Sequence, residues 1–154
     1  MKTIIVSNTN KTITIDDEDY ERLKDFIYSD NGNGYLRRCL YGSRSRKSDI
    51  ANDVLRTKDY LIDHKDGDGY NNLRSNLRIA NKSLNASNTD KHKDSKSPYK
   101  GVFYNKRDRK WQAKICKDYN QIHIGYFFTA EEAAIAYNKK ALELFGEFAR
   151  LNII

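Results

Sequence analysis

Side chains that could together hydrolyse a phosphodiester occur between residues 60 and 90. Asp63 and His64 end an apolar stretch, and Asn85 follows in a segment with helical spacing. A neutral imidazole can take a proton from water near neutral pH, and carboxylate and amide oxygens are ligands for a hard divalent cation. A bound cation stabilises charge on the phosphate and helps the leaving oxygen to depart. We therefore expect His64 to act as a general base while Asp63 and Asn85 hold one cation.

The elements around these residues are predicted in the order strand, loop, strand, helix. The loop is rich in Gly, Asp and Asn, and it contains Asn76, whose amide can bond backbone groups that fix the orientation of the His64 ring. Asn81 is the expected cap of the helix. The strands are expected at 60–64 and 77–79 and the helix at 81–88.

Each of these residues also has a simpler interpretation, which the residues alone leave open. Adjacent Asp and His side chains often form only a surface or structural pair. The Asp and Gly residues at 66–69 fit a tight turn or part of a calcium loop, although the EF-hand pattern fails because its twelfth position lacks Glu. The Asn residues fit turns and caps. Their joint occurrence on one strand-loop-strand-helix frame favours a nuclease site.

This segment resembles the HNH endonuclease family, in the branch with Asn at the last signature position. The resemblance rests on Asp63-His64, on Asn71-Asn-Leu-Arg-Ser-Asn76-Leu-Arg and on Asn85, and it covers residues 60–90. It implies a ββα-metal unit in which His64 is the general base and Asn76 a structural member of the catalytic set. Asp63 and Asn85 would then bind one Mg²⁺ or Mn²⁺.

The residues before this unit predict short strands and helices. A hairpin is expected from 3–6 and 12–15, and a helix from the spacing of Tyr20, Leu23 and Ile27. A turn at 31–34 leads to a strand at 35–41, a basic loop at 42–48 and a helix at 48–56. Arg44 and Arg46 in the basic loop raise the question whether residues 1–60 also contact DNA.

Beyond a polar linker at 91–98, which contains His92 and no predicted site, the pattern predicts a sheet and a helix. Strands are expected at 102–105, 111–116 and 121–127. Thr129 and Glu132 form a capping box, and Ala133, Tyr137 and Ala141 lie on one apolar helix face. Gly146 is the expected stop.

The C-terminal segment resembles the plant ethylene-response-factor (APETALA-type) DNA-binding domain. The resemblance rests on Tyr99-Lys-Gly101-Val-Phe-Tyr, Lys110-Trp-Gln-Ala-Lys-Ile115, Ile124-Gly-Tyr-Phe127 and the helix that follows. It implies that the sheet enters the DNA major groove while the helix braces it. The period-two alternation of the middle strand favours core packing for Trp111. The plant domains carry more Arg on the exposed face, so their target sequence is not transferred. The predicted DNA-binding residues are Lys100, Arg107, Arg109, Lys110, Gln112, Lys114, Gln121 and His123.

The charge of the chain also favours nucleic-acid binding, and its composition argues against a zinc-thiolate, disulfide-rich or membrane protein. The net charge is +7, and residues 91–117 contain ten Lys or Arg against Asp94 and Asp108, a stripe suited to a polyanion or, alternatively, to simple solvation. Cys39 and Cys116 form no CxxC pair, so a thiolate zinc site and a disulfide framework are not expected. With no apolar membrane span or signal peptide, we expect a cytoplasmic protein. The resemblance to HNH endonucleases implies that it is phage-encoded and acts in a bacterial host.

These observations predict an α+β protein with an HNH endonuclease domain at 1–90, a linker at 91–98 and a DNA-binding domain at 99–154. The expected function is metal-dependent nicking of double-stranded DNA by a monomer, without a small-molecule cofactor or a membrane. Two alternatives stay open on the same scaffold. One is an inactive, sequence-specific DNA-binding regulator, and the other is a phage interaction or inhibitor protein.

Overall fold

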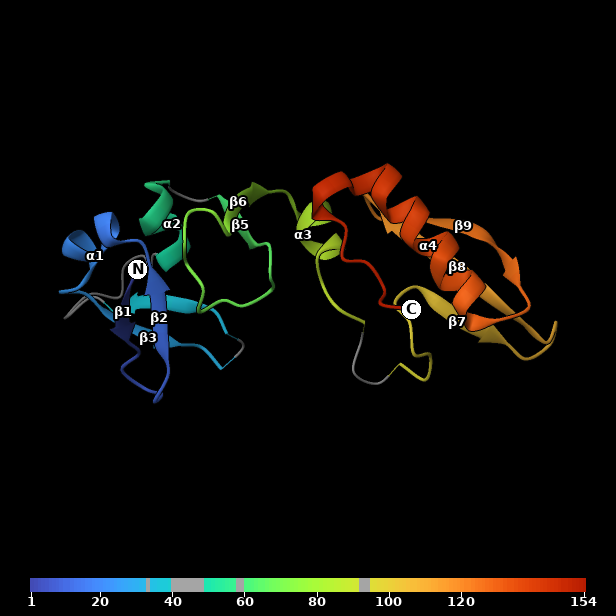
Figure 1. Ribbon diagram of the computed structural model, residues 1–154, viewed down its shortest axis with the longest axis horizontal. Coiled ribbons are helices and arrows are strands. Elements are labelled where there is room, and N and C mark those ends of the chain that lie inside the picture. Colours follow the sequence, from blue (N-terminus) through green and yellow to red (C-terminus); the bar gives the residue numbers. More distant parts are fainter. Residues whose placement is uncertain (33, 40–48, 58–59, 92–94) are drawn as a thin grey trace. The chain divides into compact units, whose positions relative to one another are not determined.

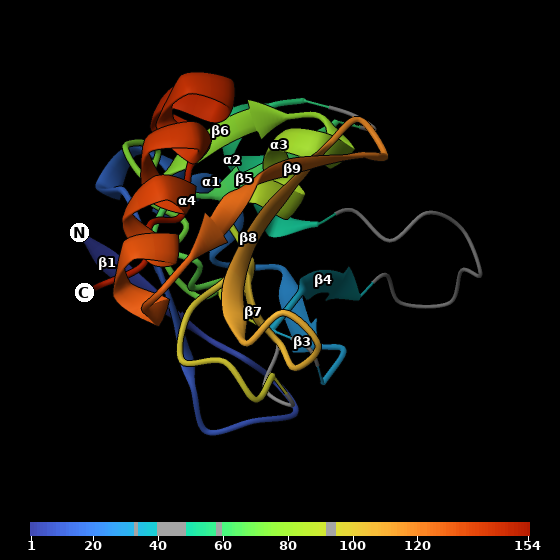
Figure 2. The same ribbon diagram turned by 90° about the vertical axis from the view of Figure 1, so that its right-hand side faces the viewer.

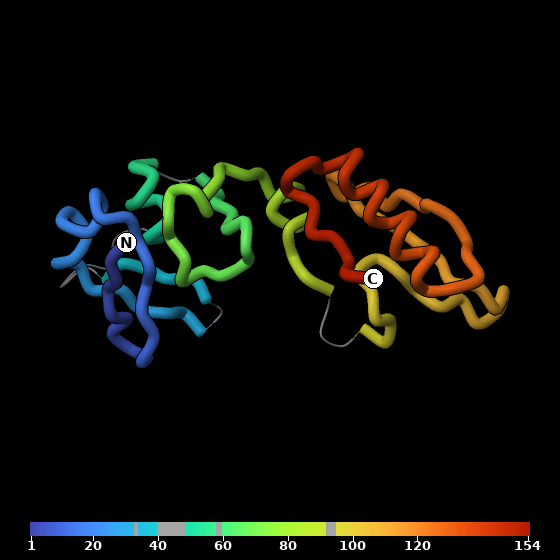
Figure 3. The backbone as a smooth tube through the Cα atoms, viewed as in Figure 1, coloured from blue at the N-terminus to red at the C-terminus, as the bar shows by residue number. Residues whose placement is uncertain are grey.

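The computed structural model describes residues 1–154 except 33, 40–48, 58–59 and 92–94 (Figure 1). Contacts divide the chain into two compact units, Met1–Ala80 and Asn81–Ile154. The chain leaves the first unit after β6 and enters the second at α3. Figure 3 traces the backbone from the blue N-terminus to the red C-terminus. Each unit has its own sheets, helices and apolar core.

Among its described residues, the first unit consists of antiparallel hairpins and short helices. β1 (Lys2–Ile5) pairs with β2 (Thr12–Ile15), β3 (Ile27–Asp30) with β4 (Leu36–Cys39), and β5 (Leu61–His64) with β6 (Leu77–Ala80). The helices are α1 (Asp17–Leu23) and α2 (Ile50–Leu55). The predicted first hairpin and the predicted strand-loop-strand frame are confirmed. The predicted basic loop 42–48 lies outside the described residues.

The first helix is shorter than its apolar spacing predicted. Tyr20 and Leu23 lie on α1, but Ile27 is wrong as a helical residue because it begins β3 and pairs with β4. Tyr28, the next residue, is fully buried in the core. Strand pairing satisfies this backbone while the tyrosine ring is buried, so packing overrides the local helical period.

One apolar core anchors the hairpins of the first unit. Ile62 of β5 and Leu77 of β6 are part of it, so the hairpin that bears Asp63 and His64 is fixed to the rest of the unit. The buried members of this core are Ile4, Val6, Ile13, Ile15, Leu23, Tyr28, Leu36, Ile50, Ala51, Val54, Ile62 and Leu77.

The second unit is a three-stranded antiparallel sheet packed on one long helix, as predicted. The sheet has the order β7 (Val102–Asn105), β8 (Lys110–Lys117), β9 (Asn120–Phe127), and α4 (Ala130–Phe145) lies along one face of it (Figure 2). The capping box of Thr129 and Glu132 is present in full. The helix ends at Gly146, followed by a single 3-10 turn, Gly146–Phe148. The α+β class is confirmed.

Gly101 permits the close approach between the sheet and α4. Its φ is +71°, and a β-carbon placed on it would lie 2.1 Å from the Tyr137 ring and 2.7 Å from the Lys114 carbonyl oxygen. Only glycine fits a backbone with this φ and this spacing. The position explains why glycine precedes the first strand of the sheet.

Helix α3 (Lys82–Ser87) belongs by its contacts to the second unit. Asn81 caps it as predicted, since its side chain accepts from Leu84 N at 2.8 Å. The sequence predicted this helix as the last element of a domain of residues 1–90, whereas it packs with α4 and the 3-10 turn. The functional domains at 1–90 and 99–154 stay predictions, and His92 lies outside the described residues.

The remaining expectations concern cysteines and membranes. Cys39 and Cys116 are both free thiols. Within the described part of the chain, none of the helices has the length and apolar character of a membrane span.

Candidate functional site

The β5–β6 hairpin places Asp63 opposite Arg78 and His64 opposite Leu77. Asp63 is buried, and its Oδ2 accepts from Arg78 Nε at 2.8 Å and lies 2.6 Å from Arg78 Nη2. The side chains of both ions are at least nine-tenths buried. The pair orients the carboxylate within the hairpin, and removing either partner would leave the other charge buried without its partner.

The His64 ring is oriented by Asn72. His64 Nε2 lies 3.2 Å from Asn72 Oδ1, and the amide of Asn72 is itself fixed because its Nδ2 donates to the Gly69 carbonyl at 2.9 Å. Asn72 is fully buried, and its backbone N–H donates to Thr14 O at 2.8 Å. An amide oxygen can only accept, so Nε2 carries a proton and the neutral ring has its lone pair on Nδ1. This is the tautomer in which Nδ1 can serve as a base.

Asn76 holds the loop between the two strands. Its Nδ2 donates to Asp66 Oδ1 at 2.9 Å and to the Asn71 carbonyl at 2.8 Å, and its Oδ1 accepts from Asp66 N at 3.2 Å. Burial by itself would raise the pKa of Asp66, but the Asp68 N–H and the Asn76 and Asn71 amides lower it below the ordinary value. Asn76 therefore bonds the loop, while Asn72 bonds the ring.

Asn85 lies on α3 in the second unit, with a half-buried side chain. Among the described residues, no group of three or more His, Cys, Asp or Glu side chains is placed to hold a metal ion. The predicted ligands, one carboxylate and one amide, would leave other positions of a hard cation to water and phosphate.

Sequence reasoning missed Asn72 and Arg78. Arg78 could have been found, because antiparallel pairing of the two predicted strands brings it opposite Asp63. Asn72 carried no such signal. It is one of several Asn residues in the loop, and only the folded loop distinguishes the one that faces the ring.

The sheet of the second unit exposes most of the predicted DNA-binding residues on the face away from α4. Val102, Ala113 and Ile115 are buried against the helix, so their neighbours in the pleat face outward. Lys114 stands opposite His123 on this outer face. Trp111 packs in the core, as predicted. The other predicted residues of the outer face are Lys110, Gln112 and Gln121.

Three predicted DNA-binding residues lie elsewhere. Arg107 and Arg109 are exposed in the turn between β7 and β8, with the Arg107 side chain 94% exposed. Lys100 precedes β7, and its ammonium donates to the carbonyls of Ser87 and Thr89 at 2.7 and 2.6 Å. Its charge is thus directed at backbone atoms of its own unit.

Comparisons with known proteins found three similar sequences, whereas no family model and no solved structure matches. An uncharacterized HNH endonuclease of Acanthamoeba polyphaga mimivirus is 38% identical over 96 residues, which cover 62% of this chain and 49% of that protein. Protein 3.8 of Escherichia phage T7 is 32% identical over 93 residues, or 60% of this chain and 76% of that protein.

The third similar protein is an ethylene-responsive transcription factor of Arabidopsis thaliana. It is 37% identical over 103 residues, or 62% of this chain and 60% of that factor. The chain thus spans about half of the mimivirus protein and three fifths of the plant factor. Both resemblances stated from the sequence are confirmed at this distance.

Proposed function

Because this chain belongs to the family of phage T7 protein 3.8 and is a distant homologue of an HNH endonuclease, we propose that it is a metal-dependent DNA endonuclease. It hydrolyses a phosphodiester bond of double-stranded DNA, and a single site cuts one strand. The observation that carries the proposal is the 3.2 Å contact of His64 Nε2 with Asn72 Oδ1, from which we infer that Nδ1 is the basic nitrogen of the neutral ring.

His64 accepts the proton of the attacking water on Nδ1. Asn72 keeps the proton on the opposite nitrogen, so the ring does not have to change tautomer before it acts. When the water is deprotonated, the ring becomes an imidazolium, which can return the proton to the leaving oxygen. Asn76 keeps the loop around the ring closed.

Asp63 would supply a carboxylate ligand for the cation, Mg²⁺ or Mn²⁺, and Asn85 on α3 stays a predicted amide ligand. Their oxygens have the chemistry that these ions prefer, and a carboxylate can accept from Arg78 and still bind a cation because each oxygen has two lone pairs. When bound, the cation stabilises the charge that develops on the phosphate. Arg78 then keeps the carboxylate oriented within the hairpin.

The outer face of the β7–β8–β9 sheet binds the duplex. The similarity to the plant transcription factor and the basic excess of residues 91–117 support this part of the proposal. We assign a phosphate contact to Lys114 and a contact with a base edge to Gln112. Lys114→Ala should therefore weaken binding and flatten its dependence on salt.

A plasmid-relaxation assay tests the catalytic proposal. Supercoiled DNA with Mg²⁺ or Mn²⁺ should be converted to the nicked form, and EDTA should stop the reaction. His64→Ala should slow nicking by roughly 10²–10⁴-fold, the usual contribution of a general base. His123→Ala is the matched control, because His123 lies on the sheet face, so it should change DNA affinity more than the rate of nicking at saturating DNA.

The second candidate is a DNA-binding regulator without catalysis. The buried pair of Asp63 with Arg78 favours it, because that contact satisfies the carboxylate in the absence of a cation. Wild-type protein that binds DNA but leaves the plasmid supercoiled with either cation would support the regulator and refute the nuclease.

A further inference from the structure

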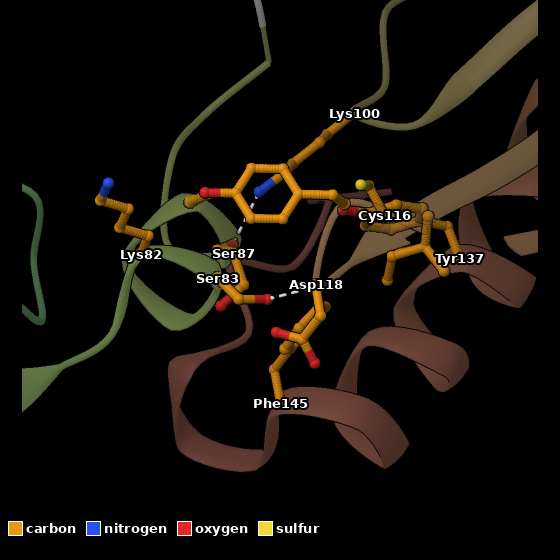
Figure 4. Close-up of a pocket in the computed structure, with 11 residues that line it drawn as sticks. Lys82, Ser83, Ser87, Lys100, Cys116, Asp118, Tyr137 and Phe145 are labelled. Atoms are coloured by element: carbon orange, nitrogen blue, oxygen red, sulfur yellow. Dashed lines mark hydrogen bonds between the residues drawn. The ribbon is translucent and has the colours of Figure 1, made fainter. Parts of the chain in front are cut away.

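Helix α3 is attached to the second unit along one side. Leu84 packs against the cluster of Ile115, Tyr137 and Phe145. Ser87 Oγ donates to the Phe148 carbonyl at 2.9 Å, and Asp118 N donates to Ser83 Oγ at 3.1 Å (Figure 4). The contacts come from the sheet, from α4 and from the segment after it, so α3 is enclosed on this side.

The C-terminal end of α3 is bonded by a lysine. Carbonyls in the last turn of a helix lack intrahelical partners, and a cation is the strongest donor for them. Lys100 Nζ donates to the carbonyls of Ser87 and Thr89, as the dashed line to Ser87 in Figure 4 shows. Burial lowers the pKa of Lys100 to about 8, which fits an ammonium that is largely removed from water.

The backbone of Lys100 is fixed as firmly as its side chain. Its N–H donates to Asn152 Oδ1 at 2.7 Å, and its carbonyl accepts from Asn152 Nδ2 at 3.2 Å. Asn152 in turn exchanges two hydrogen bonds with the Asn138 side chain on α4. Lys100 therefore reaches α3 from a rigid base rather than from a flexible strand end.

Asn85 lies on the opposite side of α3 from these contacts. Successive residues of a helix are rotated by about 100° around its axis. Ser83, Leu84 and Ser87 therefore lie within one third of the circumference, and Asn85 lies roughly 150° around the axis from the centre of that arc. The contacts that fix the helix thus leave the half-buried Asn85 on the side of α3 away from them, with Lys82 at a similar angle on the other flank. A fixed helix is suited to presenting a polar residue on that side.

We propose that Lys100 holds α3, and with it Asn85, on the C-terminal sheet and helix instead of binding DNA phosphate. This proposal rests on the proposed function in one respect, which is that Asn85 is a cation ligand. It makes Lys100 a positioning residue, since it acts through α3 and touches neither the reacting atoms nor the DNA. It also makes the DNA-binding unit the part of the protein that carries Asn85.

The test compares Lys100→Met with Lys114→Met in the full chain. Methionine keeps the length of the stem and removes the ammonium. A cavity of about 200 Å³ beside α3 lets water replace the lost donor, so the sheet should stay folded. Lys114→Met removes an ammonium of the outer sheet face and is the matched control.

Lys100→Met should raise the amide-exchange rates of residues 85–88 on the order of tenfold or more, because charge-assisted bonds to two carbonyls are lost. The salt dependence of its DNA binding should stay unchanged, and kcat for nicking should fall with little change in KM. Lys114→Met should leave the amide-exchange rates of α3 unchanged. The slope of the logarithm of its DNA-binding constant against the logarithm of the salt concentration should become smaller in magnitude by about 0.9, the value for one phosphate contact. Lys100→Arg should restore part of the protection.

The proposal would be overturned if residues 85–88 of Lys100→Met exchanged their amides at the wild-type rate while the salt dependence of its DNA binding became weaker. If that variant does not fold, amine-specific labelling of the wild type decides instead. DNA should protect Lys114 and leave the labelling of Lys100 unchanged, and protection of Lys100 by DNA would refute its role at α3. Wild-type protein that never nicks refutes the proposed function alone, because exchange and salt slope still report on Lys100.

Discussion

At the scale of single residues, the proposed site depends on amides that hold the His64 ring and its loop. The buried amide of Asn72 decides which nitrogen of His64 carries the proton, and Asn76 closes the loop that carries Asn72. An amide is suited to this task because it supplies an acceptor and donors without adding a charge to a buried place.

Asn72→Ala should slow nicking while DNA affinity stays the same. Without the Oδ1 acceptor, the two tautomers of His64 become closer in energy and the ring loses its fixed orientation, so we expect a fall in kcat of roughly 10- to 100-fold. The unfolding free energy should also drop by about 1–3 kcal/mol, because the Gly69 carbonyl loses its donor. Single-turnover nicking and urea unfolding measure both effects, and an unchanged nicking rate would remove Asn72 from the mechanism.

At the scale of elements, one arginine connects the loop after β5 to both helices of the first unit. Arg74 donates to Asp19 of α1 through Nε at 2.7 Å and Nη2 at 2.9 Å, and to the Val54 carbonyl of α2 at 3.0 Å. Asp19 also accepts from Arg22 at 2.6 Å. The loop that positions His64 is therefore anchored by a carboxylate whose side chain is 1% exposed.

Asp19→Asn should lower the unfolding free energy at neutral pH by about 1.5–3 kcal/mol, because the partly exposed Arg74 and Arg22 lose their hydrogen bonds to a charged acceptor. Burial would raise the pKa of Asp19, but the hydrogen bonds from Arg74 and Arg22 hold it below the ordinary 3.8. When the pKa of a carboxylate is lower in the folded state than in the unfolded state, its contribution to stability is fully present at a pH above the unfolded-state pKa. The contribution is lost as the pH falls through the folded-state pKa.

Urea unfolding from neutral pH down through this acid range measures the effect of Asp19→Asn. The wild type should lose stability below about pH 4, whereas the variant should show a flatter curve there. Parallel curves for the two proteins would mean that Asp19 does not carry the pH dependence.

The elements also show what sequence reasoning can and cannot reach. Hairpins and the Thr129 capping box were predictable because turn and cap residues act within a few positions of the chain. Ile27 was assigned to a helix because its spacing from Tyr20 and Leu23 is helical. The burial of Tyr28 in the core, which favours the strand, was not visible from the sequence. Asp63 and His64 were proposed from residue type and spacing. The Arg78 partner of Asp63 follows from strand pairing, whereas the contact of His64 with Asn72 depends on how the loop folds.

At the scale of the whole molecule, the boundary between the two units cuts across the predicted nuclease unit. Contacts assign β5 and β6 to the first unit and α3 to the second. The sequence placed the boundary at the polar stretch 91–98 because composition changes there. Composition indicates where the chain is polar. The unit boundary instead follows where Leu84 packs and where the carbonyls at the end of α3 find donors.

Two pairs of fragments distinguish these boundaries. Residues 81–154 should unfold cooperatively and be more stable than residues 91–154 by about 2 kcal/mol, since the shorter fragment loses the packing of Leu84 against Phe145 and its neighbours. Residues 1–90 should be no more stable than residues 1–80, because residues 81–90 then have no sheet or α4 to pack on. Urea unfolding of the four fragments measures both differences. If residues 81–90 stabilise the N-terminal fragment and not the C-terminal one, α3 belongs to the nuclease unit, and the coupling of Asn85 to the DNA-binding sheet is lost with that result.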